Sequence, residues 1–273
     1  MKLVKFIPAT IGLICSVNVH AGLFSSSDDF KCDRDDAVKA LQQYVKDYSS
    51  GMVQRDSLKK TSLLFNKPAD MYIEKLVLLP VNIKNVSTTD NTNVSEISCE
   101  AHVDIPLPAN ALDVIHAMPE QMSGLQFGHA KFYNSTIVWK KYEYTLKLAD
   151  NKKDISVVDN MSNAASATLY GIVVLTTNKD EFIKANALQK LAIAKDDYQI
   201  ADADLNATWQ ELPASSRNTL KLPQLAWVKG KAFACGKISD AELATTDAET
   251  SVKIYNCQTK MTHERNTFLS GSN

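Results

Sequence analysis

The pattern of apolar and polar residues divides the chain into a first part with strand-like segments and a last part that is helical. Residues 33–48 predict an amphipathic helix, because Val38, Leu41, Val45 and Tyr48 recur at helical spacing and Gly51 follows as a stop. A short helix is expected over residues 110–117, and strand-like patterns occupy residues 71–86, 94–105, 136–148, 155–158 and 167–177.

From residue 179 onward the pattern favours helices. A first helix is marked by Phe182, Leu188, Leu191 and Ala192. Its continuation, or a second helix, is marked by Leu205, Trp209 and Leu212 and ends at Pro213. Ser215 or Ser216 is the expected N-cap of the next helix, which has Leu220, Gln224, Trp227 and Lys231 at positions i, i+4, i+7 and i+11. The last helix is expected over residues 250–269.

These elements predict an α+β fold with two modules, residues 22–178 and residues 179–273. A helix followed by an antiparallel meander is the element order of a cystatin-like or NTF2-like roll, in which the helix packs on one face of a curved sheet. The second module is expected to be a small all-α unit. No internal repeat is visible in either module.

Residues 1–21 have the three regions of a secretory signal peptide. Lys2 and Lys5 form the basic region, residues 6–17 form a short apolar stretch, and Val19 and Ala21 are the small residues of a cleavage site. The residue before Cys15 is Ile14 rather than a small residue, which disfavours a lipidated cysteine. We therefore expect cleavage before Gly22 and a periplasmic or secreted bacterial protein.

Removal of residues 1–21 leaves an even number of cysteines, which are Cys32, Cys99, Cys235 and Cys257. In an exported protein such a set indicates two disulfides. Three connectivities are possible, and the grouping into an early and a late pair favours Cys32–Cys99 and Cys235–Cys257. Zinc binding is disfavoured because no two cysteines have the Cys-x2–4-Cys spacing and the histidines form no ligand cluster.

Several short motifs in the helical part share their order and spacing with a known family. The run at residues 201–209 is similar to the "ADAELNxxY" signature of the LprI-type lysozyme-inhibitor domain, with Asp202, Leu205, Asn206 and Trp209 at the matching positions. Arg217 and Leu220 match its "R..L" step, and Gln224 and Trp227 match its "Q..W" step. Cys235 stands where the family has a cysteine, and the closing "C....T..R...L" pattern is matched by Cys257, Thr262, Arg265 and Leu269. The resemblance covers residues 196–270 and implies a protein partner, a lysozyme.

The chain departs from that family at three positions: Trp209 replaces a tyrosine, Lys231-Ala232 replaces an Arg-Asp pair, and Pro223 predicts a kink or a restart in the helix. The additional upstream cysteine pair of the family is also missing. The shared residues are interpreted as structural, with Leu205, Trp209, Leu220 and Trp227 in the core. Asn206 and Gln224 are expected to satisfy buried polar groups, and Arg265 to pair with Asp202 or Asp204 or else to be solvated.

Composition excludes several classes of protein. The chain has 30 Lys and Arg against 31 Asp and Glu, and loss of Lys2 and Lys5 with the signal peptide gives a net charge of −3. This balance excludes a strongly basic nucleic-acid binder, and no apolar run is long enough to predict a membrane span. The hydrophobic share of 45% is typical of a globular protein.

No motif predicts catalysis. The sequence has no G-x-S-x-G elbow, no H-E-x-x-H and no glycine-rich phosphate loop, and the acids Asp33, Asp35 and Asp36 are explained by their place at a helix start. We therefore expect no cofactor and no metal. The favoured function is an exported binding protein, a lysozyme inhibitor of the LprI type. The alternatives are a non-catalytic envelope interaction or scaffold protein and a hydrolase with a dispersed site. The oligomeric state is not predicted.

Overall fold

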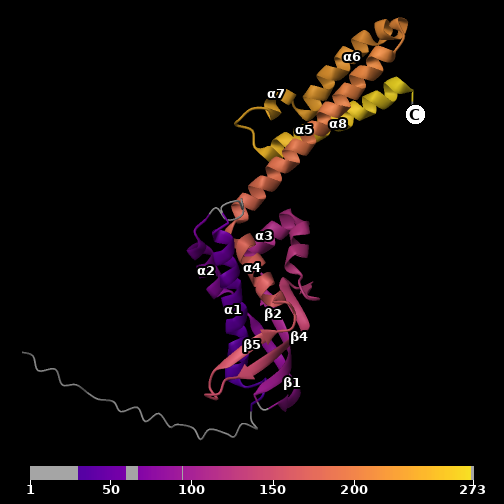
Figure 1. Ribbon diagram of the computed structural model, residues 1–273. Coiled ribbons are helices and arrows are strands. Elements are labelled where there is room, and N and C mark those ends of the chain that lie inside the picture. The colour runs from indigo at the N-terminus through magenta and orange to yellow at the C-terminus, as the bar shows by residue number, and fades with distance from the viewer. Residues whose placement is uncertain (1–29, 60–66, 94, 272–273) are drawn as a thin grey trace, which may run out of the picture.

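The computed structural model describes residues 30–59, 67–93 and 95–271, and is α+β. The expected signal peptide, residues 1–21, and the expected new N-terminus at Gly22 lie outside the described residues. We call residues 30–178 the α+β part and residues 179–271 the helical module. Figure 1 shows an elongated molecule in which α5 leaves the α+β part and runs into the helical module.

The α+β part holds a five-stranded antiparallel sheet. Its order is β1-β2-β4-β3, and β5 also pairs with β4. Helices α1, α2, α3 and α4 pack together around it, and α4 contacts α1, α2, α3 and β2. The strands are β1 (Asn82–Asn93), β2 (Glu96–Pro106), β3 (Lys131–Tyr133), β4 (Thr136–Leu148) and β5 (Ile155–Asp159), and the helices are α1 (Asp35–Ser57), α2 (Ala69–Leu78), α3 (Ala109–Ala117), the 3-10 helix η2 (Pro119–Leu125) and α4 (Ala164–Thr177).

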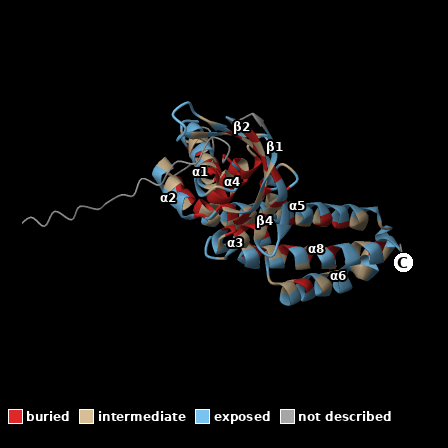
Figure 2. Ribbon diagram, turned by 90° about the horizontal axis from the view of Figure 1, so that it is seen from below, coloured by how far each residue is buried: buried red, intermediate tan, exposed pale blue. Residues whose placement is uncertain are grey.

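The main core lies between the sheet and these helices. Side chains alternate between buried and exposed along β2 and β4, so that cross-strand partners such as Ile97 and Leu146 are both buried. Two of the buried aromatic residues of β4 have partners for their polar atoms: Trp139 Nε1 donates to the Phe127 carbonyl at 2.9 Å, and Tyr142 donates to the Asp159 carboxylate. Figure 2 shows the buried residues concentrated in this part of the molecule.

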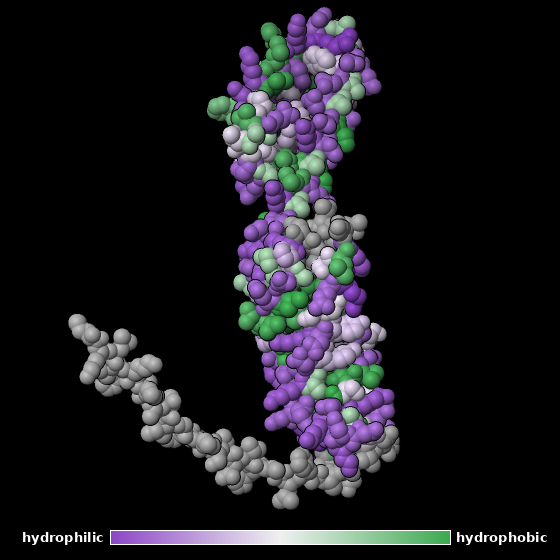
Figure 3. All heavy atoms as spheres, turned by 60° about the vertical axis from the view of Figure 1, so that its left-hand side comes forward, coloured by the Kyte–Doolittle hydropathy of each residue, from purple (hydrophilic) through white to green (hydrophobic). Residues whose placement is uncertain are grey.

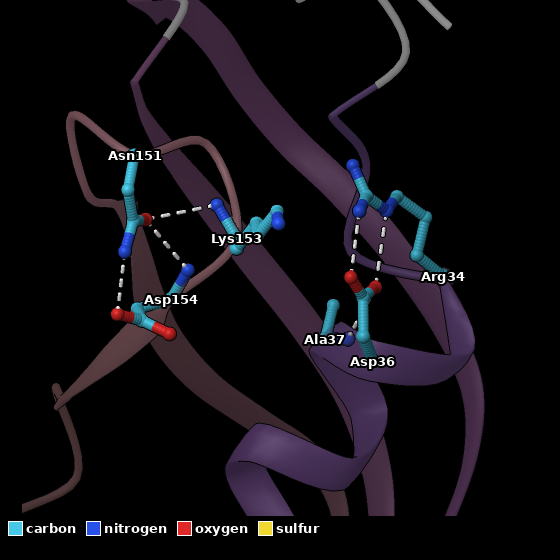
Figure 4. Close-up of polar contacts among 6 residues, drawn as sticks. All are labelled: Arg34, Asp36, Ala37, Asn151, Lys153 and Asp154. Atoms are coloured by element: carbon cyan, nitrogen blue, oxygen red, sulfur yellow. Dashed lines mark hydrogen bonds and ion pairs between the residues drawn. The ribbon is translucent and has the colours of Figure 1, made fainter. Parts of the chain in front are cut away.

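Local polar contacts fix the start of α1 and the turn between β4 and β5 (Figure 4). Arg34 forms two bonds with the Asp36 carboxylate, which also accepts from the Ala37 amide at 2.9 Å. Burial acts to raise the pKa of Asp36, but the Arg34 guanidinium and this amide outweigh it and hold the pKa below its usual value. In the turn, Asn151 Oδ1 accepts from the amides of Lys153 and Asp154, both at 3.0 Å.

Two segments that were expected to be strands are helices. Residues 71–78 belong to α2, which buries Tyr72 and Leu76 one turn apart, and the extended Leu79 before Pro80 ends it. Residues 167–177 belong to α4, which is buried on almost all sides. A short apolar run that is buried all round has no clear period, which is why the sequence pattern could not separate helix from strand there.

The other helices and strands expected in the α+β part correspond to elements of the structure, with one shifted boundary. The expected short helix corresponds to α3, and the expected strands at residues 94–105, 136–148 and 155–158 correspond to β2, β4 and β5. Helix α1 continues past Gly51 to Ser57 because Val53 is buried in the core, and this packing outweighs the low helix propensity of glycine.

The helical module consists of α5 (Lys179–Glu211), α6 (Ala214–Cys235), α7 (Ile238–Ala241) and α8 (Ala248–Ser270). Beyond the α+β part, α5 pairs with α8, and α6 and α7 pack on α8. α5 is one continuous helix, and α6 follows Pro213 directly, so neither Ser215 nor Ser216 is an N-cap. The exposed Pro223 lies inside α6, which does not restart there.

Two disulfides are present, one in each part. Cys32–Cys99 has a Cα–Cα distance of 5.8 Å and attaches the segment before α1 to β2. The amide of Cys32 also donates to Thr88 Oγ1 at 3.2 Å, which adds a contact to β1. The bridge therefore connects the first helix to two neighbouring strands that are far from it in the sequence.

Removal of the Cys32–Cys99 bridge should strongly destabilise the α+β part. The bridge spans 67 residues, and the chain-entropy relation gives a loss of about 4 kcal/mol in the free energy of unfolding for Cys32→Ala with Cys99→Ala. Urea unfolding followed by circular dichroism measures it. The matched control, Cys235→Ala with Cys257→Ala, opens a span of only 22 residues and should cost less, about 3 kcal/mol. An unchanged urea midpoint in the first variant would contradict this expectation.

Candidate functional site

The inner faces of α5 and α8 form the centre of the helical module. Ala194, Ala201 and Leu205 recur at i, i+7 and i+11 on α5 and are buried. On α8 the buried residues are Ser251, Tyr255, Gln258, Thr262 and Leu269. The core cluster proper consists of Ala194, Ala241 and Tyr255 with partly buried neighbours, so this module has far fewer buried apolar side chains than the α+β part.

A disulfide and a hydrogen bond attach the end of α6 to α8. Cys235 and Cys257 have a Cα–Cα distance of 5.5 Å. Gly236, which follows α6, has a φ of +87° that favours glycine, and its carbonyl accepts from Gln258 Nε2 at 2.5 Å. These two contacts compensate for the small apolar core by holding α6 in place.

Lys231 occupies the space between α6 and its neighbours. Its side chain is only 6% exposed, and its Nζ donates to Thr262 Oγ1 at 3.0 Å. The same Nζ lies 5.0 Å from the centre of the Trp227 ring and 5.3 Å from that of Tyr198, within the range of cation–π attraction. Burial lowers the pKa of Lys231, and the nearby Asp202 carboxylate acts in the opposite direction.

Arg265 contacts the Trp227 ring, which Lys231 also contacts. Its Cζ is 5.8 Å from the Trp227 ring centre and 4.7 Å from that of Phe268, and its Nε donates to Gln224 Oε1 at 2.7 Å. Burial lowers the pKa of Arg265. Trp227 is therefore shared by two cations and connects α6 to α8 through polar as well as apolar contacts.

The structure corrects three expectations about the motif residues. Arg265 pairs with neither Asp202 nor Asp204 and is not fully solvated, because Gln224 and two aromatic rings already surround it. Asn206 is exposed and donates to Asp202 at 3.2 Å instead of satisfying a buried group. The four residues expected in the core also differ: Leu205 is buried, whereas Trp209, Leu220 and Trp227 are half-buried because α6 packs loosely on α8.

A groove of about 310 Å³ lies among α5, α6, α7 and α8. Motif residues from two helices line it, namely Asp202, Leu205, Asn206, Gln224 and Trp227, together with Tyr198, Lys231 and Gln258. Its only acid is Asp202 and its cations are lysines, so it lacks the paired carboxylates or the histidine that acid–base catalysis uses. In the described part of the chain, no group of three His, Cys, Asp or Glu residues could bind a metal ion.

The motifs, the groove that they line and the Cys235–Cys257 disulfide all lie in the helical module. A comparison with known families gives a match in the same module. Residues 183–269 match the family model described as lysozyme inhibitor LprI. We therefore refer to the helical module as the LprI-type module. The match begins at Ile183, earlier than the motifs alone indicated, and so includes most of α5.

The match leaves the α+β part without a relative. No curated protein and no solved structure matches the chain. The likeness of the α+β part to cystatin-like or NTF2-like rolls therefore stays a prediction. Among the described helices, none is both long enough and apolar enough to cross a membrane.

The outer faces of the LprI-type module carry opposite charges, which the net charge of the chain conceals. Residues 196–216 include Asp196, Asp197, Asp202, Asp204 and Glu211 and no Lys or Arg. Residues 213–238 include Arg217, Lys221, Lys229, Lys231 and Lys237 and no Asp or Glu. The acidic stretch lies on the second half of α5, whose first half also carries lysines, and the basic stretch lies mainly on α6, so these two segments carry charge of opposite sign.

The outward side of α5 is the functional candidate that the sequence motifs did not indicate. Ile193, Asp197, Ile200, Asp204 and Glu211 recur at helical spacing about a quarter of a turn around the helix from its buried residues, and all five are exposed. We call these five residues the acidic face. In the part of the chain that the structure describes, none of its carboxylates forms a salt bridge. Their regular spacing was visible in the sequence, but the inward side could not be identified without the packing of α8.

Replacement of Trp227 by alanine should destabilise the LprI-type module by about 3 kcal/mol, because it removes a half-buried ring and the cation–π contacts of Lys231 and Arg265. Hydrogen exchange of the α6 and α8 amides measures this loss locally. The matched control is Phe233→Ala on the same helix, since Phe233 is exposed and should change stability by less than about 0.5 kcal/mol. Equal effects of the two variants would show that Trp227 has no special role.

Proposed function

We propose that the protein is an exported bacterial binding protein whose LprI-type module inhibits a lysozyme. The observation that carries this proposal is the family match over residues 183–269, which covers almost all of α5 to α8. The signal-peptide pattern of residues 1–21 and the two disulfides support export into an oxidising compartment. We also propose that residues 179–273 form a domain distinct from residues 22–178.

The acidic face is the proposed contact surface for the enzyme. A lysozyme of basic charge is attracted by carboxylates that are exposed and unpaired, and the attraction raises the rate of association. Ile193 and Ile200 lie among these carboxylates and are 53% and 59% exposed, so they supply apolar area that a polar surface would lack. Inhibition would follow if the bound module covers the cleft in which the enzyme holds its substrate.

The groove supports a structural rather than a catalytic role. Its central cation, Lys231, contacts Thr262 and two aromatic rings, and the Asp202 carboxylate accepts from Asn206. These contacts use the groove residues to hold α5, α6 and α8 together. We therefore propose a function in protein binding without catalysis, cofactor or metal.

The chain that begins at Gly22 should inhibit a cationic lysozyme. With a dissociation constant near 1 µM, about 10 µM of the chain should lower the rate of cell-wall clearing roughly tenfold, because most of the enzyme is then bound. Turbidity of a cell-wall suspension measures the rate, and several lysozyme types should be compared. Full activity of all of them at this concentration would contradict the proposal. Capture of envelope proteins by the same chain would then favour the alternative of a scaffold protein.

Charge reversal on the acidic face should weaken this inhibition. Asp197→Lys with Asp204→Lys places two repelling charges opposite a cationic enzyme, and the inhibition constant should rise roughly tenfold, with a smaller difference at high salt. The matched control is Asp70→Lys with Asp150→Lys, which changes the net charge equally at exposed positions of the α+β part. If both pairs weaken inhibition equally, net charge is responsible and the acidic face is not the contact surface.

A further inference from the structure

The side of α6 that points away from the other helices is apolar. Leu222, Leu225, Lys229 and Phe233 lie at i, i+3, i+7 and i+11, so they form one stripe along the helix. The three apolar members are 77%, 52% and 92% exposed. The stripe Leu220, Gln224, Trp227 and Lys231 is half-buried or buried and faces the module. We call the first set the outer stripe of α6.

Nothing in the described chain covers the outer stripe. Gly230 lies beside Phe233 and Lys229 on the helix, and a Cβ atom placed on it would meet no atom within 4 Å. Large apolar side chains of this exposure are costly to leave in water unless they have a partner. Figure 3 shows apolar side chains at the surface of the LprI-type module among hydrophilic ones.

The charge around the outer stripe has one sign. Lys221, Lys229 and Lys237 are exposed, Arg217 is half-buried, and residues 213–238 contain no acid. Among the described residues, none of these four cations forms a salt bridge. A partner that covers the outer stripe must therefore present negative charges to the lysines and apolar groups to the leucines and Phe233.

We propose that the outer stripe of α6 docks on the surface of an anionic lipid bilayer. Leucine and phenylalanine side chains on one side of a helix, with lysines and no acids around them, are the composition of helices that lie in the membrane interface. The lysines contact lipid phosphates, and Leu222 and Phe233 enter the boundary of the acyl chains. α6 lies on the bilayer and does not cross it.

The acidic face of α5 determines the orientation of the bound molecule. Its carboxylates are repelled by anionic lipid, so α5 points away from the bilayer while α6 lies on it. Membrane docking and lysozyme binding then use different helices, and the first does not depend on the second. A bilayer is favoured over a protein partner because the outer stripe is the convex surface of a helix. A protein partner would need a groove of matching shape, whereas a fluid bilayer does not.

Co-sedimentation with vesicles tests the proposal on the chain that begins at Gly22. Vesicles with about 40% phosphatidylglycerol in phosphatidylcholine should sediment the protein, and pure phosphatidylcholine should sediment much less, because the lysines gain roughly fivefold in binding for each cation near an anionic surface. Leu222→Ser with Phe233→Ser should lower the partition coefficient at least about tenfold, and Lys221→Gln with Lys229→Gln should lower it in a salt-dependent manner.

The matched control is Ile193→Ser with Ile200→Ser, which removes two exposed apolar side chains from α5. This control should bind vesicles like the wild type, and the α6 variants should keep the wild-type circular dichroism and lysozyme inhibition. Absence of sedimentation, or equal loss in control and α6 variants, overturns the proposal. It is also overturned if the α6 variants instead abolish self-association in sedimentation velocity, since the stripe would then bind a second copy.

Discussion

Asn178 is the one residue between α4 and α5, and its buried amide fixes this junction to α2 and α4. Its Oδ1 accepts from the Tyr72 hydroxyl at 2.9 Å and its Nδ2 donates to the Val174 carbonyl at 3.1 Å. Its own carbonyl accepts from the Phe182 amide at 2.9 Å, which begins α5 directly. Phe182 belongs to the core of the α+β part, and Lys179 pairs with Asp113 of α3. The start of α5 is therefore fixed, and its far half extends from the sheet into the LprI-type module (Figure 1).

The small core of the LprI-type module explains why polar contacts and a disulfide have so large a share in it. The space between α6 and α8 is filled by Lys231, Arg265 and Gln224 around Trp227, where a larger domain would place aliphatic side chains. This arrangement uses few apolar residues inside, so that several remain outside on α5 and α6. The outer surfaces are consequently free to differ in charge, and each can serve a different partner.

The sequence predicted those elements whose pattern has a clear period. α1, α3 and α8 and the strands β2, β4 and β5 follow from spacing, the disulfide pairing was favoured by the grouping of the cysteines, and the family of the second module came from the resemblance of its motifs. α2 and α4 were expected to be strands because both are short runs rich in apolar residues, and α4 is buried on almost all sides and carries no clear helical period. The environment of Arg265 and the exposure of Trp209 depend on how α6 and α8 pack, which a single sequence does not contain. The acidic face was missed because the expected net charge of −3 averages an acidic helix with a basic one.

The central claim is that the acidic face of α5 is in direct contact with a cationic lysozyme. A carbodiimide joins a carboxylate to a lysine only when the two groups touch, so cross-linking followed by mass spectrometry locates the contact. The account predicts that Asp197, Asp204 and Glu211 are linked to lysines of the enzyme. Links confined to acids of residues 30–178, or to lysines of α6, would contradict it.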